Sequence, residues 1–129
     1  MAHIVFDKEQ ILSSSRVFEK KIPDEKLIIP NKVFQNLRGR NKDKLINAIN
    51  ENIISIGEDC EKIRIPGSRL EEDIYTLSQA INSKKLGIEV FICTENEELK
   101  GISLNHGIIS ISKEMIIEKI DRIITNEKK

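Results

Sequence analysis

The sequence predicts an α/β domain, a three-layer α/β/α sandwich in which helices cover both faces of a mainly parallel sheet. Two observations lead to this prediction. Short runs rich in β-branched residues indicate strands, and between them apolar residues recur every three or four positions, which is typical of helices. Strands that alternate with helices are joined by crossovers, which place neighbouring strands parallel. A chain of 129 residues has room for one such domain and not for two.

The first predicted elements are a strand over residues 3–6 and a helix that follows it directly. Asp7 is expected to cap this helix, because Gln10 stands three positions further on, as in a capping box. The helix should end before Pro23 and bury one side. The residues expected on that side are Ile11, Leu12, Ser15 and Phe18.

Further elements follow in the same alternation. A brief extended segment at 27–30 precedes a short helix that Gly39 ends, and apolar residues at helical spacing predict another helix over 43–54. Ile63 and Ile65 alternate with charged residues and predict a strand, after which Ser68 and Glu71 form a capping box for a long helix. The remaining predictions are strands at 86–94 and 108–111 and a last helix from Ser112.

The overall composition limits which partners the protein can bind and indicates its cellular compartment. The 21 basic and 21 acidic side chains cancel, so any nucleic acid or anionic partner must be held by a local patch. No apolar run reaches the ~18 residues of a membrane span, and Asp7 interrupts the N-terminal apolar stretch where a signal peptide would continue. Cys60 and Cys93 lack metal spacing and are expected to be free thiols. These features predict a cytoplasmic protein without a membrane partner.

Polar residues directly follow two of the predicted strands. Asp7 comes after the first, and Thr94, Glu95 and Asn96 come after the strand at 86–94, while Asp73 lies in the first turn of a helix. In open α/β sheets, ligands bind beyond the carboxyl ends of the strands. Oxygen ligands gathered from separate segments at one edge suit Mg²⁺ or Mn²⁺. The sequence therefore predicts a site for a hard divalent cation at this edge.

Four segments in order along the chain resemble the motifs of the PIN domain, a metal-dependent ribonuclease fold. In the first, an acid ends the opening strand, and in the second a proline precedes a valine by three. In the third, an acid opens a helix with alanine seven places on, and in the fourth a strand is followed by threonine, any residue, and Asp or Asn. The segments are 4–12, 28–37, 73–80 and 91–99. The predicted central sheet is therefore PIN-like, with a single domain over residues 1–125 and a frayed tail over 126–129.

The resemblance implies an endoribonuclease in which metal-activated water attacks a phosphodiester bond. It implies Asp7, Asp73 and Asn96 as metal ligands, with Asn36 completing the catalytic set. Two positions depart from the family pattern. Asn36 stands where the family has glutamate, and Asn96 stands where aspartate is common, so only Asp7 and Asp73 remain as acids. Glu9, Glu72 or Glu95 are alternatives for the missing acid.

Structural roles remain open alternatives for the same residues. Asp7 would stabilise the protein by ~1 kcal/mol simply as a helix cap, and Asp73 by ~0.3–1 kcal/mol through the helix dipole. Asn36 is equally compatible with a surface position and Asn96 with a turn.

The phosphate contacts of a neutral nuclease must come from local cations. Arg38, Arg40 and Lys42, in the densest basic stretch, are the candidates, together with Thr94 beside the site. The alternative for the basic stretch is a solvated interhelical loop, and the same alternative holds for Arg64 and Arg69 beside the Pro66-Gly67 turn.

Three functions therefore stand side by side. The first is an RNA-cleaving enzyme of toxin, RNA-processing or defence type, whose toxin form would be held by an antitoxin partner. The second is a catalytically degenerate relative that binds RNA or protein. The third is a small inhibitor or immunity-type protein. A homodimer is compatible with all three.

Overall fold

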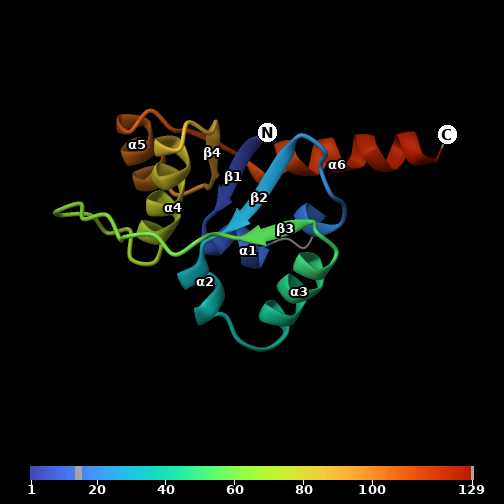
Figure 1. Cartoon of the computed structure of the whole chain (residues 1–129), viewed down its shortest axis with the longest axis horizontal. Coiled ribbons are helices and arrows are strands. Elements are labelled where there is room, and N and C mark those ends of the chain that lie inside the picture. The colour runs from blue at the N-terminus through green and yellow to red at the C-terminus, as the bar shows by residue number, and fades with distance from the viewer. Residues whose placement is uncertain (14–15, 129) are drawn as a thin grey trace.

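Residues 1–13 and 16–128 are described by the structure, a computed structural model, and within them five strands form one sheet. All four neighbouring pairs are parallel, and the order across the sheet is β3-β2-β1-β4-β5 (Figure 1). The strands are β1 (Ala2–Phe6), β2 (Glu25–Ile29), β3 (Ile54–Ile56), β4 (Val90–Cys93) and β5 (Ile109–Ile111).

The same residues form six α-helices and one 3₁₀ helix, η1. These are α1 (Lys8–Ser13), η1 (Arg16–Phe18), α2 (Asn31–Asn36), α3 (Gly39–Asn50), α4 (Asp73–Lys85), α5 (Glu97–Asn105) and α6 (Lys113–Glu127). Helices lie on both faces of the parallel sheet, so the predicted α/β/α sandwich is confirmed.

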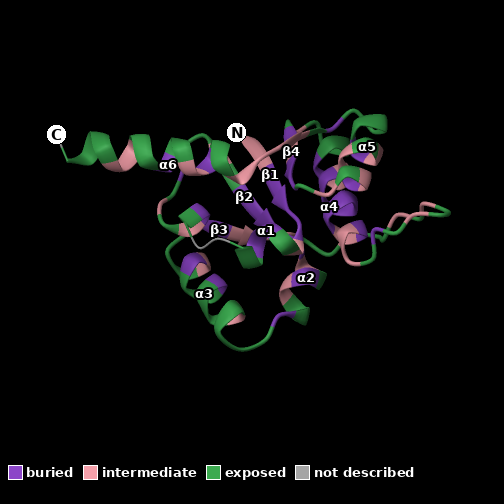
Figure 2. Cartoon of the chain, turned by 180° about the vertical axis from the view of Figure 1, so that it is seen from behind, coloured by how far each residue is buried: buried purple, intermediate pink, exposed green. Residues whose placement is uncertain are grey.

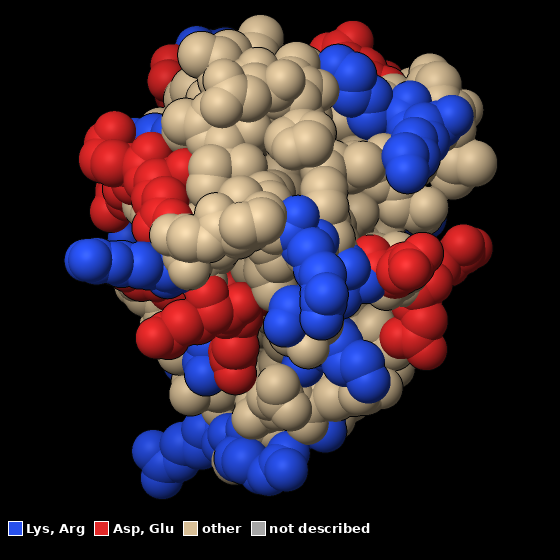
Figure 3. Space-filling model, turned by 90° about the vertical axis from the view of Figure 1, so that its left-hand side faces the viewer, with Lys and Arg blue, Asp and Glu red and all other residues tan. Residues whose placement is uncertain are grey.

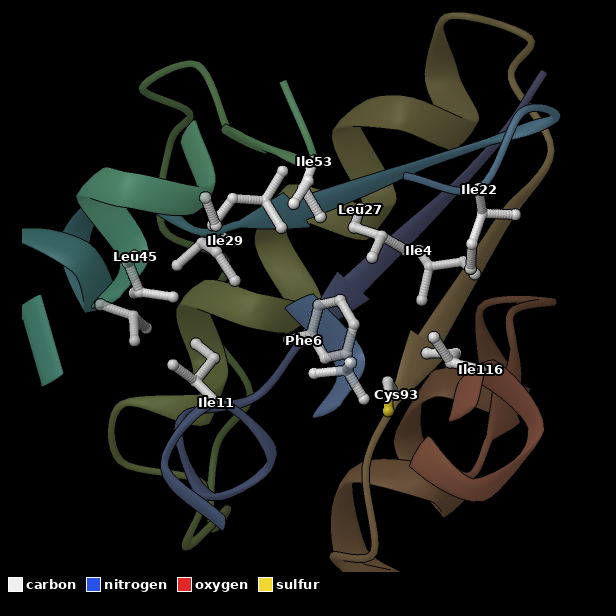
Figure 4. Packing of buried hydrophobic residues seen from close by; sticks show 14 of the residues in the cluster. Ile4, Phe6, Ile11, Ile22, Leu27, Ile29, Leu45, Ile53, Cys93 and Ile116 are labelled. Carbon is white, nitrogen blue, oxygen red and sulfur yellow. The ribbon is translucent and has the colours of Figure 1, made fainter. Parts of the chain in front are cut away.

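Alternation along the central strands divides the core in two. Ile4 and Phe6 of β1 point into one cluster and Val5 into the other, because successive strand side chains face opposite sides. The first cluster packs the sheet against α1, α3 and α6 (Figure 4), and the second packs it against α4 and α5. Burying each such side chain contributes roughly 1.5–3 kcal/mol. The middle strands are consequently the most buried part of the molecule (Figure 2).

The strand predicted at 63–65 was wrong. These residues lie in a loop between β3 and α4, where the Ile63 backbone N–H donates to the Ser78 hydroxyl (2.9 Å) and not to a neighbouring strand. Ile63 and Ile65 are half-buried, as expected for apolar residues that alternate with charged ones. The strand that pairs with β2, however, is formed by Ile54–Ile56. The helix predicted over 43–54 accordingly ends at Asn50, and Asn52 turns the chain with φ 61°.

One helix boundary near the site also differs from prediction. Glu71 has φ 50°, which is incompatible with a helix that starts at Ser68, and α4 begins at Asp73. Helix α5 was not predicted at all. Of the residues predicted on the buried side of the first helix, Ile11 is buried but Leu12 is exposed, and Ser15 lies outside the described residues.

The C-terminal helix is longer than predicted. It continues past Thr125 to Glu127, so residues 126 and 127 of the predicted frayed tail are helical, and an ion pair between Lys20 and Glu127 (2.7 Å) holds this end. Both cysteines are free, as expected, with Cys93 buried and Cys60 half-buried. In the described part of the chain no helix combines the length and apolar character needed to cross a membrane.

Candidate functional site

The site lies where two central strands end. From β1 the chain continues to β2 on one side, whereas β4 pairs with β1 on the other, so the carboxyl ends of β1 and β4 form a topological switch point. Ligands of open parallel sheets bind at such points. Phe6 pairs with Cys93, and the next backbone bond runs from the Asp7 N–H to the Cys93 carbonyl (3.2 Å). Asp7 and Thr94 are therefore neighbours at this edge.

Asp7 is held on both of its carboxylate oxygens. Oδ1 accepts the backbone N–H of Gln10 (2.8 Å), and Oδ2 accepts a short hydrogen bond from the Thr94 hydroxyl. The first bond confirms the predicted helix cap. Asp7 is only 1% exposed, so the carboxylate lies beneath the surface of this edge.

Asn96 connects the other predicted site residues. Its backbone N–H donates to Thr94 Oγ1 (3.0 Å), and its side-chain Nδ2 donates to Asp73 Oδ2 (3.0 Å). Its Oδ1 accepts the N–H groups of Glu98 and Leu99 and caps α5. A continuous chain of hydrogen bonds thus runs from Asp7 through Thr94 and Asn96 to Asp73. Three segments far apart in the sequence contribute to one polar centre.

In this orientation Asn96 presents its amide nitrogen to Asp73, while its oxygen is occupied by the helix cap. The metal-ligand role of Asn96 stays a prediction. The cap itself was the missed signal for α5, because an asparagine followed by two glutamates, Glu97 and Glu98, is a typical helix start.

A buried hydroxyl fixes α4 against β1. The Thr76 Oγ1 donates to the carbonyl of Phe6 (3.0 Å), and the Thr76 side chain is fully buried. Asp73 lies three residues earlier on the same face of α4. The position of Asp73 relative to Asp7 therefore depends on the hydrogen bond between Thr76 and Phe6, which lie 70 residues apart. The sequence analysis did not predict this contact.

Burial dominates the electrostatics of both acids. Desolvation raises the pKa of Asp7 to about 6, against the hydrogen bonds from Thr94 and Gln10, and the charge of Asp73 adds to the increase. The pKa of Asp73 is also raised, first by desolvation and then by Glu9 and Glu72, and the hydrogen bond from Asn96 opposes this. Negative charge is therefore unfavourable at this centre.

A cleft of about 550 Å³ opens beside Asp73. It is walled by the start of α1 and the residues that lead into α4, and Lys8 and Glu72 form an ion pair (3.0 Å) between the two walls. Glu9 and Glu72 line it, whereas Glu95 and Asp7 do not. Of the three acids considered as substitutes, the structure thus places two beside Asp73. Among the described residues no three His, Cys, Asp or Glu side chains form a metal-binding group.

Gln10, three residues after Asp7, is a second buried polar residue at the start of α1. Its side chain is 1% exposed, and among the described residues neither its amide oxygen nor its nitrogen has a hydrogen-bond partner. An unpaired buried amide costs about 1–3 kcal/mol. The first turn of α1 therefore carries polar groups that do not serve stability.

The remaining predicted residues are not part of the centre. Asn36 is exposed at the end of α2, and none of the described hydrogen bonds involves its side chain. The guanidinium of Arg38 donates to the carbonyls of Gln35 (2.8 Å) and Leu37 (3.0 Å), which occupies it within its own turn. Lys42 lies over the Phe34 ring at 5.0 Å. The cleft beside Asp73 is not lined by Arg38, Arg40 or Lys42.

Comparison with protein-family models gives no match for this sequence, and comparison with curated proteins gives no significant match.

Proposed function

We propose that this chain is a PIN-like metal-dependent endoribonuclease with Asp7 and Asp73 as its essential acids. The observation that carries the proposal is the hydrogen-bonded centre of Asp7, Thr94, Asn96 and Asp73 at the switch point of a parallel sheet. The motif resemblance supports the same residues independently, because it selects them by sequence order alone.

The donor chemistry fits Mg²⁺ or Mn²⁺, which prefer carboxylate oxygens. Both acids have a raised pKa, so their ionised forms are destabilised, and a divalent cation would offset this cost. Asp7 and Asp73 would hold the ion. When bound, it would activate a water and stabilise negative charge on the phosphodiester oxygens.

The protein's own residues position the two carboxylates. Thr94 and the backbone of Gln10 fix Asp7, and Asn96 fixes Asp73, so neither acid is free to rotate. Glu9 and Glu72 add negative charge to the cleft that gives access to Asp73. A substrate phosphate approaching this cleft would be repelled unless a cation were present, which makes the proposed reaction dependent on metal.

The test is Mn²⁺ binding by calorimetry and cleavage of a labelled RNA by the wild type, Asp7→Asn and Asp73→Asn. We expect metal-dependent cleavage that falls by at least about 100-fold in both variants, the scale seen on loss of an essential electrostatic group. Glu95→Gln is the matched control, since it removes a carboxylate that lies after β4, between Thr94 and Asn96, but does not line the cleft. Cleavage that survives in Asp73→Asn would contradict the proposal.

The second candidate is a catalytically degenerate PIN-like module that binds RNA or protein. It is favoured by the burial of Asp7 and by Asn36, which stands exposed where the family motif has glutamate. In that case RNA binding without cleavage is expected in the assay above. An inhibitor or immunity-type protein would give neither metal nor RNA binding.

The proposed setting is the cytoplasm, as a toxin, RNA-processing or defence nuclease. A toxin role would require an antitoxin partner, and co-purification with a protein that suppresses cleavage would identify it. A homodimer is compatible with either role, and sedimentation would detect it.

A further inference from the structure

A long loop separates β3 from α4. Residues 57–72 contain no helix or strand, and the segment projects from the body of the molecule beyond α4 (Figure 1). Loops of more than about 12–15 residues without secondary structure are uncommon in compact domains and usually serve binding. Its outer part, residues 62–69, is called the arm below.

Both ends of the arm are anchored. At one end the Ile63 N–H donates to the Ser78 hydroxyl (2.9 Å), and Ile63 and Ile65 pack against the second core cluster. At the other end the Arg69 N–H donates to Glu98 Oε1 (2.8 Å), and the following residue, Leu70, is buried. The arm therefore presents its side chains from a supported backbone.

The arm is the basic part of a loop whose other residues, 57–61 and 70–72, carry five acids and no base. Lys62, Arg64 and Arg69 are exposed, and residues 62–69 include no acid. Within the described chain none of these three cations forms an ion pair. Lys62 makes a cation–π contact, with its Nζ 5.5 Å from the centre of the Tyr75 ring. On the face toward which the arm projects, Lys and Arg side chains gather in the middle, with acids on either side (Figure 3).

The arm connects to the candidate site. It lines a cleft of about 900 Å³ that extends to Glu71 and Ile74. Glu71 also lines the smaller cleft beside Asp73, so the two clefts adjoin. A polyanionic strand lying along the arm would be led to the acidic centre.

We infer that the arm is the RNA-backbone binding site of this protein, with Lys62, Arg64 and Arg69 contacting phosphates on the way to Asp73. This inference rests on the proposed function for its choice of ligand. It replaces Arg38, Arg40 and Lys42 as the phosphate-binding residues, since Arg38 is occupied by its own turn and none of the three lines either cleft. Three unpaired cations beside a cleft complement a phosphodiester chain.

The test measures binding of labelled oligouridine of about 16 nucleotides by fluorescence anisotropy in EDTA, so that cleavage plays no part. The arm variant is Lys62→Gln/Arg64→Gln/Arg69→Gln. The matched control is Arg38→Gln/Arg40→Gln/Lys42→Gln, which removes the same charge elsewhere. We expect the arm variant to bind about tenfold or more weakly, with the slope of log K against log salt reduced by about 2, and the control to change far less. Equal unfolding midpoints would show that both variants are folded.

Equal losses in the two variants, a loss in the control alone, or no binding by the wild type would overturn the inference. Tighter binding of polyglutamate than of oligouridine would overturn it in favour of an acidic protein partner. The proposed function is tested separately, by measuring RNA cleavage in the presence of Mn²⁺. Binding that depends on the arm without any cleavage supports the arm and contradicts the nuclease, whereas cleavage with unchanged KM in the arm variant contradicts the arm alone.

Discussion

At the scale of single residues, Asp7 makes one structural contact and one contact within the candidate site. Its Oδ1 caps α1 through Gln10, which is a purely structural contact, and its Oδ2 meets Thr94 inside the candidate site. A cap at the surface would stabilise the helix without a penalty. At 1% exposure, however, the charged form loses solvation, and the pKa rises to about 6. A carboxylate kept at such a position is typical of a functional site.

This raised pKa predicts how stability changes with pH. The unfolded pKa is near 3.8, so between about pH 4 and pH 6 the folded state keeps a proton that the unfolded state has lost. The free energy of unfolding should therefore decrease as pH rises through this window, by about 2 kcal/mol. Urea unfolding in EDTA at about pH 4 and pH 6 measures it.

Asp7→Asn is the variant that isolates this effect. It keeps an oxygen for the helix cap and removes the titration, so its stability should depend less on pH, with a residual slope from Asp73, whose pKa is raised in the same direction. Identical pH dependence in the wild type and the variant would show that Asp7 is not the group responsible.

At the scale of elements, α4 carries Asp73 to the site because Thr76 joins it to the end of β1. Thr76→Val keeps the shape and removes the donor, so the buried carbonyl of Phe6 loses this hydrogen bond. We expect a loss of about 1–3 kcal/mol in the free energy of unfolding, together with weaker Mn²⁺ binding as α4 shifts. Thr76→Ser retains the hydroxyl and should restore metal binding. If serine were as damaging as valine, the methyl group and not the hydrogen bond would be the important feature.

Helix α5 contributes to the site through its cap. Asn96 uses its oxygen to hold the first turn of α5 and its nitrogen to hold Asp73, so one amide joins the element to the site. Asn96 stands where the PIN motif that residues 91–99 resemble commonly has aspartate. The asparagine is not a simple loss, because an ionised aspartate could not donate to Asp73.

At the scale of the whole molecule, the sheet order brings the start of α2 close to the site, since β2 lies beside β1 and both end at the same edge. The PIN motif that residues 28–37 resemble has glutamate where this chain has Asn36. Asn36 itself lies at the other end of α2, outside the hydrogen-bonded centre. Asn36→Glu should still raise the affinity for Mn²⁺, because a third carboxylate increases the long-range attraction for a divalent ion. Calorimetric titration measures this. Gln35→Glu adds the same charge one residue earlier, and an equal gain in both variants would count against the motif register.

Local patterns by themselves determined much of this protein. Periods of two and of three to four residues specify strands and helices without knowledge of their neighbours, and they were sufficient for the α/β class. The cap of Asp7 on Gln10 spans three residues and was predictable for the same reason. That Asp7, Asp73, Thr94 and Asn96 lie at one edge followed from the rule that parallel strands end together.

Only the tertiary structure decided which candidates became strands and which side chains meet. Both 54–56 and 63–65 are isoleucine alternations, and pairing of Ile54 with Leu27 selected the first and left the second in the arm. The burial of Asp7, the bond from Thr76 to Phe6 and the separation of Asn36 from the centre likewise depend on contacts between distant segments. Such contacts leave no periodic trace in the sequence, because their free energy arises only when the sheet has assembled.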